Sequence, residues 1–333
     1  MNTTNQLITD IKGGKIAPIY FLMGEEAYYI DVISDFIESY VLAEEEKGFN
    51  QMVFYGKDVS IQDIVSNAKR YPMMAERQVI IVKEAQNLIK TIEQLVDYAK
   101  NPQPTTVLVF NYKYKTLDKR KALYKVLSKA AVVFESKKIY EDKIPSWIQS
   151  FLRSKQISIT PKAALMLTEF LGNDLSKIAN ELNKLEIVVG TQKEITPDII
   201  EQNIGISKDY NNFELQKAIG NLDHKKAYQI VRYFAQNSKQ HPFVLTISIL
   251  YMYFTKLMTL HTVRDRNPGT VAKALGINPY FVNDYIAVSR NFPMKRISGV
   301  LETLRIYDTK SKGLGANLSP KDLYNELIYN ILK

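Results

Sequence analysis

The chain has 333 residues and no cysteine, which excludes a disulfide scaffold, a zinc–thiolate site, an iron–sulfur cluster and a cysteine nucleophile. Hydrophobic residues make up 46% and charged residues 24%, as in ordinary folded domains, and the length is enough for two or three of them. No stretch approaches the roughly 20 consecutive apolar residues of a membrane span, and the N-terminus (MNTTNQLITDIKGG) is polar rather than signal-like. We therefore expect a cytoplasmic protein that does not engage a membrane.

The positive charge is concentrated in the last third of the chain. Lys and Arg number 44 against 35 Asp and Glu, a net charge of +9. Residues 208–333 hold 18 basic and 9 acidic residues and so account numerically for the whole excess. This surplus favours an acidic partner such as nucleic acid, with a charged, solvated surface as the alternative. The candidate contacts with DNA or a partner are Arg264, Arg266, Lys295, Arg296, Lys310 and Lys312.

The first 140 residues alternate between short β-rich runs and segments of helical period, which predicts a parallel sheet with crossover helices. We expect one α/β domain over residues 1–140. The predicted strands are 19–23, 52–55, 79–82, 107–110 and 131–134, and the predicted helices are 27–42, 61–69, 88–100 and 119–129.

After residue 140 apolar residues recur at helical spacing almost to the end of the chain. Residues 141–207 predict a small module of three or four helices, in which Asn173 or Asp174 caps a helix over 175–189. Residues 208–333 predict a third, helical domain of five or six longer helices. The expected breaks are at His241-Pro242, Asn267-Pro268-Gly269, Asn278-Pro279 and Phe292-Pro293.

The predicted α/β domain lacks the residues of a nucleotide site. A phosphate loop needs several glycines, a lysine and a Ser or Thr, but the turn after the first strand (MGEEAYY) offers only Gly24, followed by Glu25 and a second glutamate that would repel phosphate. At the end of the third strand, Lys83 occupies the position of a metal-binding acid, and Glu84 alone follows it. We therefore predict a degenerate, non-functional nucleotide site and no cofactor.

The sequence also lacks the signals of other catalytic centres. His224, His241 and His261 have neither H-x-x-x-H nor H-E-x-x-H spacing, so no metal site is expected from them. No G-x-S-x-G nucleophile motif occurs. We expect no intrinsic enzymatic activity.

Three motifs in order resemble the delta subunit of the bacterial DNA polymerase III clamp loader. The first is residues 18–26 (PIYFLMGEE) together with the degenerate third strand, 79–88 (VIIVKEAQNL). The second is residues 173–185 (NDLSKIANELNKL), close to that family's "N-D-L … E-L-x-K-L" helix. The third is residues 304–313 (LRIYDTKSKG), which looks like its "D-x-x-x-K-G" helix end. The resemblance runs over essentially the whole chain.

The resemblance implies an AAA+-like first domain without a functional P-loop or ATPase activity, a small helical lid domain and a helical collar domain. Its implied partners are the beta sliding clamp, other loader subunits of delta-prime and tau/gamma type, and primed DNA within the assembly. In that family the first domain holds the clamp ring open through two adjacent hydrophobic residues on a short helix before the third strand. By position these match Met73 and Met74.

The residues themselves agree with this placement. In the segment RYPMMAER, Pro72 is suited to the first position of a short helix, and two consecutive large apolar residues cannot both face one small core. At least one of Met73 and Met74 should therefore point outward, where a flexible, polarizable side chain suits a pocket on a partner. The alternative is that both methionines cap the edge of the sheet.

The favoured hypothesis is thus a non-catalytic clamp-loader subunit that acts by binding. A divergent NTPase or nucleotidyltransferase, whose acids converge from distant positions, is the alternative from the enzyme class, and magnesium-dependent ATP binding would indicate it. A free-standing DNA-binding protein is a third hypothesis, and steeply salt-dependent affinity for DNA without a partner would be its sign.

Overall fold

The computed structural model describes residues 3–190, 194–315 and 317–333. By its internal contacts the chain divides into two compact units, Met1–Ile139 and Tyr140–Lys333. The three-domain division expected from the sequence, 1–140, 141–207 and 208–333, stays a prediction.

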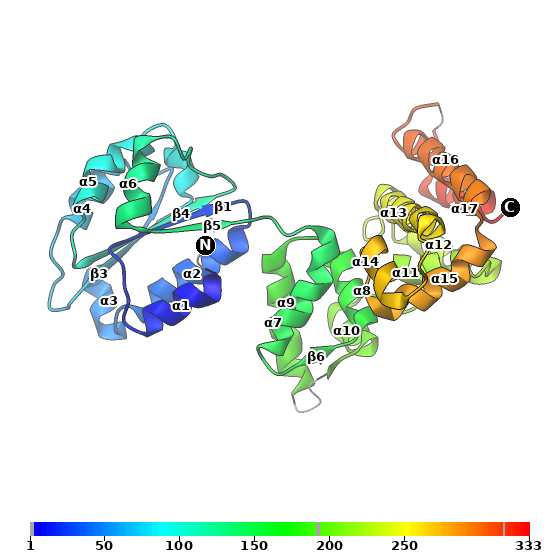
Figure 1. Ribbon diagram of the computed structural model, residues 1–333, viewed down its shortest axis with the longest axis horizontal. Coiled ribbons are helices and arrows are strands. Elements are labelled where there is room, and N and C mark those ends of the chain that lie inside the picture. The colour runs from blue at the N-terminus through cyan, green and yellow to red at the C-terminus, as the bar shows by residue number, and fades with distance from the viewer. Residues whose placement is uncertain (1–2, 191–193, 316) are drawn as a thin grey trace. The chain divides into compact units, whose positions relative to one another are not determined.

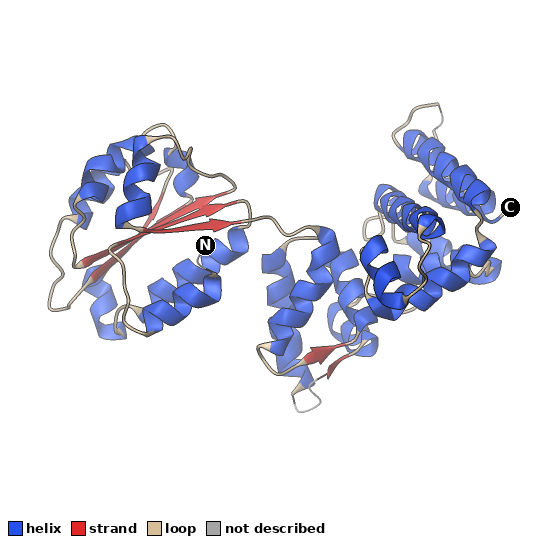
Figure 2. Ribbon diagram, viewed as in Figure 1, coloured by secondary structure: helices blue, strands red, loops and turns tan. Residues whose placement is uncertain are grey.

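A parallel five-stranded sheet forms the centre of the first unit (Figures 1 and 2). Its strand order is β2-β3-β4-β1-β5, and every neighbouring pair is parallel. Each strand includes, within a residue, the run from which it was predicted, so the parallel α/β fold expected for this part of the chain is confirmed. The strands are β1 (Ile19–Gly24), β2 (Gln51–Tyr55), β3 (Gln78–Lys83), β4 (Thr106–Lys113) and β5 (Val132–Ser136).

Helices cover both faces of this sheet, because side chains alternate between the faces along each strand. On one face Tyr20 and Leu22 of β1 pack with the helices α1 (Thr4–Lys12) and α2 (Ala27–Tyr40). On the other face Phe21 and Met23 pack with buried residues of α4 (Ile61–Ala68), α5 (Val96–Lys100) and α6 (Ala122–Ala130). All six residues of β1 are buried, as expected for the interior of a parallel sheet covered on both faces.

The helices of the first unit differ from the expectation at three places. Helices α1 and α3 (Glu44–Asn50) were not predicted. The single helix expected over 88–100 is instead two 3₁₀ turns, η1 (Ala85–Leu88) and η2 (Ile92–Leu95), followed by α5. Glu84, which precedes η1, has a left-handed backbone (φ 54°), so the chain turns sharply there before a regular helix can start.

The second unit begins with four helices and a two-stranded parallel pair, β6 (Ser158–Ile159) with β7 (Glu194–Ile195). Of the two caps that the sequence offered, Asp174 is the N-cap of α9, and its carboxylate accepts a hydrogen bond from the backbone N–H of Lys177 (3.1 Å). Proline occupies the first turn of α7, α8 and α10, where its missing N–H costs nothing. The helices are α7 (Ile144–Arg153), α8 (Pro161–Leu171), α9 (Leu175–Val189) and α10 (Pro197–Ile204).

The rest of the second unit is helical, which confirms the all-α part of the predicted fold class. Seven α-helices occupy the described residues after 211, more than the five or six expected, and each predicted proline break precedes or begins a helix. They are α11 (Asn212–Gly220), α12 (His224–Gln236), α13 (Phe243–Thr262), α14 (Pro268–Leu275), α15 (Val282–Asn291), α16 (Met294–Ser311) and α17 (Pro320–Leu332).

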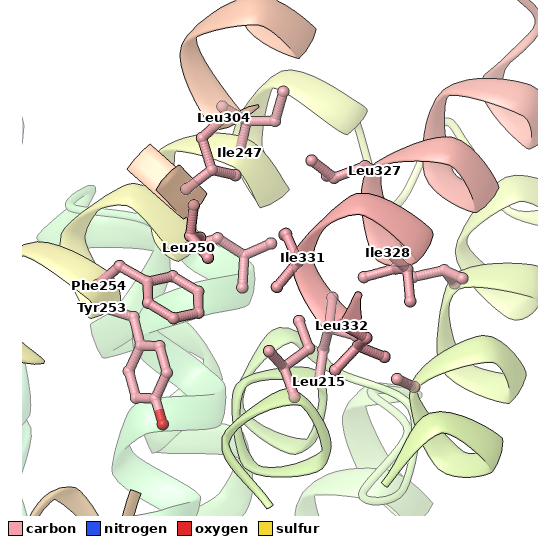
Figure 3. Close-up of a cluster of buried hydrophobic side chains, with 14 of the residues drawn as sticks. Leu215, Ile247, Leu250, Tyr253, Phe254, Leu304, Leu327, Ile328, Ile331 and Leu332 are labelled. Carbon is pink, nitrogen blue, oxygen red and sulfur yellow. The ribbon is translucent and has the colours of Figure 1, made fainter. Parts of the chain in front are cut away.

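Helix α13 lies at the centre of the main hydrophobic core of these helices. By length and composition it is the one helix in the described residues that is apolar enough to cross a membrane. Its Leu250, Phe254 and Leu257 are fully buried, and Figure 3 shows Leu250 and Phe254 in one cluster with Leu304 of α16 and Ile331 of α17. Packing against neighbouring helices thus explains the apolar residues on the buried face of α13.

Candidate functional site

The segment that carries Met73 and Met74 lies between α4 and β3. The sequence predicted a short helix starting at Pro72, and this is wrong: residues 71–77 form bends and irregular backbone. The side chain of Met73 is 56% exposed and that of Met74 is completely exposed. Neither methionine therefore caps the edge of the sheet, and both are accessible to a partner.

Local contacts explain why no helix forms here. Met74 has a left-handed backbone (φ 54°), a conformation that α-helix formation excludes. The backbone groups of Met73 bond to a side chain: its N–H donates to Asn50 Oδ1 (2.7 Å), and its C=O accepts from Asn50 Nδ2 (2.9 Å). Asn50, the last residue of α3, thus takes the place of the intrahelical partners that Met73 would otherwise need.

Two further large apolar residues are exposed, one in the methionine segment and one next to Asn50 in the sequence. Tyr71 is 77% exposed, and Phe49, the neighbour of Asn50, is 71% exposed. We call Phe49, Tyr71, Met73 and Met74 the apolar surface. Sequence reasoning missed Phe49 and Asn50, because the hydrogen bonds of Asn50 to Met73 join residues 23 positions apart and no local periodicity indicates them. Three exposed large apolar residues within one short stretch of chain, Tyr71, Met73 and Met74, are typical of a protein-binding site.

Strand β1 ends at Gly24, and both Gly24 and the following Glu25 lie against Ser136 of the neighbouring strand β5. Gly24 adopts φ 130°, and a Cβ atom there would lie 2.1 Å from the carbonyl oxygen of Ser136, so only glycine fits. The backbone N–H of Glu25 donates to that same oxygen (3.2 Å). At the start of α2, Glu26 accepts from the N–H of Tyr28 (3.3 Å), so a carboxylate occupies the helix terminus where a nucleotide site would hold phosphate.

Ion pairs occupy the carboxyl ends of β3 and β4. Lys83 Nζ lies 3.1 Å from a carboxylate oxygen of Glu38, and Lys113 Nζ lies 2.8 Å from Asp31 and 3.1 Å from Glu84. Burial opposes the charge of Lys113, but hydrogen bonds and attraction from Asp31 and Glu84 raise its pKa above the usual value. Burial likewise opposes ionisation of Glu84, but hydrogen bonds involving Gln86 and Lys113 leave its pKa lowered.

The structure separates the six basic candidates into two groups. Arg296 is engaged within the fold: its guanidinium donates to the C=O groups of Asn291 and Leu332 (3.2 Å each) and lies over the ring of Phe292. Lys310 lies 3.5 Å from Glu326 and over the ring of Tyr307, and Lys312 pairs with Asp308 at 2.6 Å. Arg296 and Lys310 thus link α16 to α17, whereas Lys312 is itself exposed and pairs within the end of α16.

The other three basic candidates, Arg264, Arg266 and Lys295, are exposed. A ring nitrogen of His261 at the end of α13 bonds to the C=O of Phe292 just before α16 (2.8 Å). Arg264 and Lys295, each three residues further along, therefore lie at the same end of the helical unit. The described residues contain no cluster of three or more His, Cys, Asp or Glu side chains suited to a metal ion.

Comparison with known proteins identifies the family. The family model for DNA polymerase III, delta subunit, matches residues 20–137, and the model for the C-terminal domain of that subunit matches residues 209–319. The DNA polymerase III subunit delta of Bacillus subtilis (strain 168) is 26% identical over 313 residues, which are 91% of this chain and 90% of that protein.

A solved structure, that of the Bacillus subtilis DNA clamp loader delta protein, matches with a TM-score of 0.55 and 23% identity over 99% of both chains, which shows a shared fold. The two family models together span more than half of the sequence, and they match the two parts in the order in which the motifs of the sequence placed them. The chain therefore belongs to the family of DNA polymerase III delta subunits.

Proposed function

We propose that this chain is the clamp-loader delta subunit that binds the beta sliding clamp through Met73 and Met74 and holds its ring open for loading onto primed DNA. The observation that carries the proposal is the pair of exposed methionines on a segment whose backbone is fixed by Asn50. A monomeric domain gains nothing from exposing such side chains, whereas a partner with an apolar pocket gains from burying them.

The binding energy available at this segment is sufficient to shift an equilibrium between ring states. Burying a Met side chain contributes about 1.5–3 kcal/mol. Saturating binding multiplies the ratio of open to closed rings by the ratio of the subunit's affinities for the two forms, so tighter binding to the open form favours it without a chemical step on this chain.

This chain hydrolyses no ATP in the proposed mechanism. Gly24 and Glu25 lie against Ser136, and Lys83 and Glu84 are paired with neighbouring side chains. ATP bound at other loader subunits would instead control when the first unit reaches the clamp. The proposal thus assigns this chain a binding role in DNA replication.

The second unit supplies the remaining contacts of the proposed assembly. Residues 208–333 would form the collar with subunits of delta-prime and tau/gamma type, and the exposed cations Arg264, Arg266 and Lys295 would face the phosphates of primed DNA or acidic neighbours. Such an assembly works on chromosomal DNA in the cytoplasm.

The test is the affinity of the purified chain for the sliding clamp of the same organism. We expect the double variant Met73→Ala/Met74→Ala to lose at least about 100-fold in affinity, because two apolar anchors are removed. Its fold should be unchanged, since both side chains are exposed.

The matched control is Met252→Ala/Met294→Ala, which removes two methionines that are each 47% exposed in the second unit. This variant should bind the clamp as the wild type does. A wild-type chain that does not bind, or a Met73/Met74 variant that binds normally, would contradict the proposal.

A further inference from the structure

The backbone of the methionine segment is held by buried polar side chains from other elements. Asn50 is 2% exposed, and besides both backbone groups of Met73 it bonds to the C=O of Glu46 (3.1 Å). Since these hydrogen bonds involve only main-chain atoms of Met73, they fix the path of the backbone and leave its side chain free.

A second buried amide holds the start of the same segment. Gln78, also 2% exposed, donates from Nε2 to the C=O of Arg70 (2.6 Å) and of Asn67 (3.2 Å), and to the hydroxyl of Thr106 (2.8 Å). Thr106 in turn donates to the C=O of Ala68 (2.8 Å). The segment is therefore anchored before Tyr71 by Gln78 and at Met73 by Asn50.

Met74 follows the second anchor directly and has a conformation that a free chain would rarely adopt. A left-handed backbone costs a non-glycine residue about 1–2 kcal/mol and persists only where its surroundings enforce it. Burial of the Met74 side chain does not offset this cost, because Met74 is completely exposed. Of the backbone anchors described above, the pair of hydrogen bonds from Asn50 to Met73 is the one adjacent to Met74.

We propose that Asn50 is a positioning residue for partner binding: by fixing the backbone of Met73 it holds Met74 in its strained, outward conformation before the clamp arrives. This inference rests on the proposed function of Met73 and Met74. A segment already ordered in the free protein loses less conformational entropy on binding, so its affinity is higher than that of the same side chains on a loose loop.

The alternative is that Asn50 only stabilises the fold, by hydrogen bonds that connect the end of α3 to the neighbouring backbone. The two roles differ in a double-mutant cycle. If Asn50 acts through the methionines, its loss weakens binding and also reduces the penalty of removing them; if it only stabilises the fold, the two losses add.

The experiment measures clamp affinity for the full chain in four forms: wild type, Asn50→Ala, Met73→Ala/Met74→Ala and the triple variant. We expect Asn50→Ala to weaken binding about tenfold, and we expect the methionine substitutions to cost markedly less in the Asn50→Ala background than in the wild type. Hydrogen exchange of the Met73 amide should be faster in Asn50→Ala, since Oδ1 no longer accepts from it.

Two controls separate positioning from loss of stability. Val107→Ala removes a fully buried side chain of β4, and should lower the melting temperature without weakening clamp binding. Asn50→Gln keeps both the acceptor and the donor but moves them by one methylene, so its affinity should lie between those of wild type and Asn50→Ala. It also serves as the test variant if Asn50→Ala does not fold.

The outcomes distinguish the two proposals. Normal affinity in a folded Asn50 variant with rapid exchange at Met73, or strictly additive losses in the cycle, would overturn the positioning role while leaving the clamp contact intact. A wild-type chain without clamp affinity, or a Met73/Met74 variant with full affinity, would overturn both.

Discussion

The two ends of strand β3 differ in the side chains around them and in how these side chains are bonded. Gln78 begins the strand, and the segment before it exposes Met73 and Met74 on a backbone held by neutral amide hydrogen bonds. Lys83 ends the strand, and there the side chains are charged, paired with one another and partly withdrawn from solvent.

This contrast reverses the usual use of a parallel α/β sheet, in which ligands bind beyond the carboxyl ends of the strands. In this chain the carboxyl end is closed by ion pairs that link the strands to α2, such as Lys113 with Asp31, and by Ser136 against Gly24. The amino end carries Tyr71, Met73 and Met74, whereas the exposed aromatic residues at the carboxyl end are Tyr55 and Tyr114. Under the proposed function, this scaffold would bind a protein surface near the amino ends of its strands instead of a small anion beyond their carboxyl ends.

The largest effect on stability should come from breaking the ion pairs at the carboxyl ends of β3 and β4. Replacing Lys113 by Met keeps the aliphatic stem but leaves Asp31 and Glu84 without their shared cation, so we expect the free energy of unfolding to fall by about 2 kcal/mol. Urea unfolding, with hydrogen exchange of β3 and β4 as a local probe, measures this.

Lys119→Met is the matched control. Lys119 pairs with Glu135 at 2.9 Å, but its side chain is 56% exposed against 13% for Lys113, so the change should cost less than about 1 kcal/mol. Equal losses in the two variants would mean that the network at the carboxyl end contributes no more than an ordinary surface ion pair.

A smaller effect, on clamp affinity, is expected from changing the apolar surface near the amino end of β3. Phe49 directly precedes Asn50, which bonds to the backbone of Met73. We expect Phe49→Ala to weaken clamp binding about fivefold, as for a residue near the edge of an interface. Tyr55→Ala is the control: Tyr55 is 50% exposed but lies at the far end of β2, and its loss should leave clamp affinity unchanged. Reversed outcomes would place the partner along the edge strand instead of at the methionine segment.

Much of this architecture could be predicted from the sequence because its signals are local. The short length and β-branched residues of apolar runs such as 79–82 favour buried strands, and Asp174 and the prolines mark helix starts within a few residues. The pattern at Gly24 and Lys83 likewise predicted the lack of a phosphate loop, since that judgement depends on which residue types are present.

The conformation of the methionine segment could not be predicted in this way. Pro72 favoured a helix locally, but Asn50 and Gln78 satisfy the backbone from elements distant in sequence, and the chain follows them instead. The internal role of Arg296 was hidden for the same reason, because its partners at Leu332 lie 36 residues away. The residue types at a site can be read from the sequence, whereas hydrogen bonds between residues distant in sequence could not be predicted from it.

The smallest expected effect is that of ATP, for which we predict none. A nucleotide present at 100 times its dissociation constant would stabilise the protein by about 2.7 kcal/mol, so millimolar Mg-ATP would reveal even a weak site as a rise in melting temperature. We expect no rise for the wild type, and none for Lys83→Asp, which restores an acid at the end of β3. One acid is insufficient because the obstacles lie elsewhere: Ser136 fills the space at Gly24, and Glu26 occupies the start of α2. A saturable, magnesium-dependent rise in either protein would show that the carboxyl end still binds ligand, and the contrast between the two ends of β3 would fail.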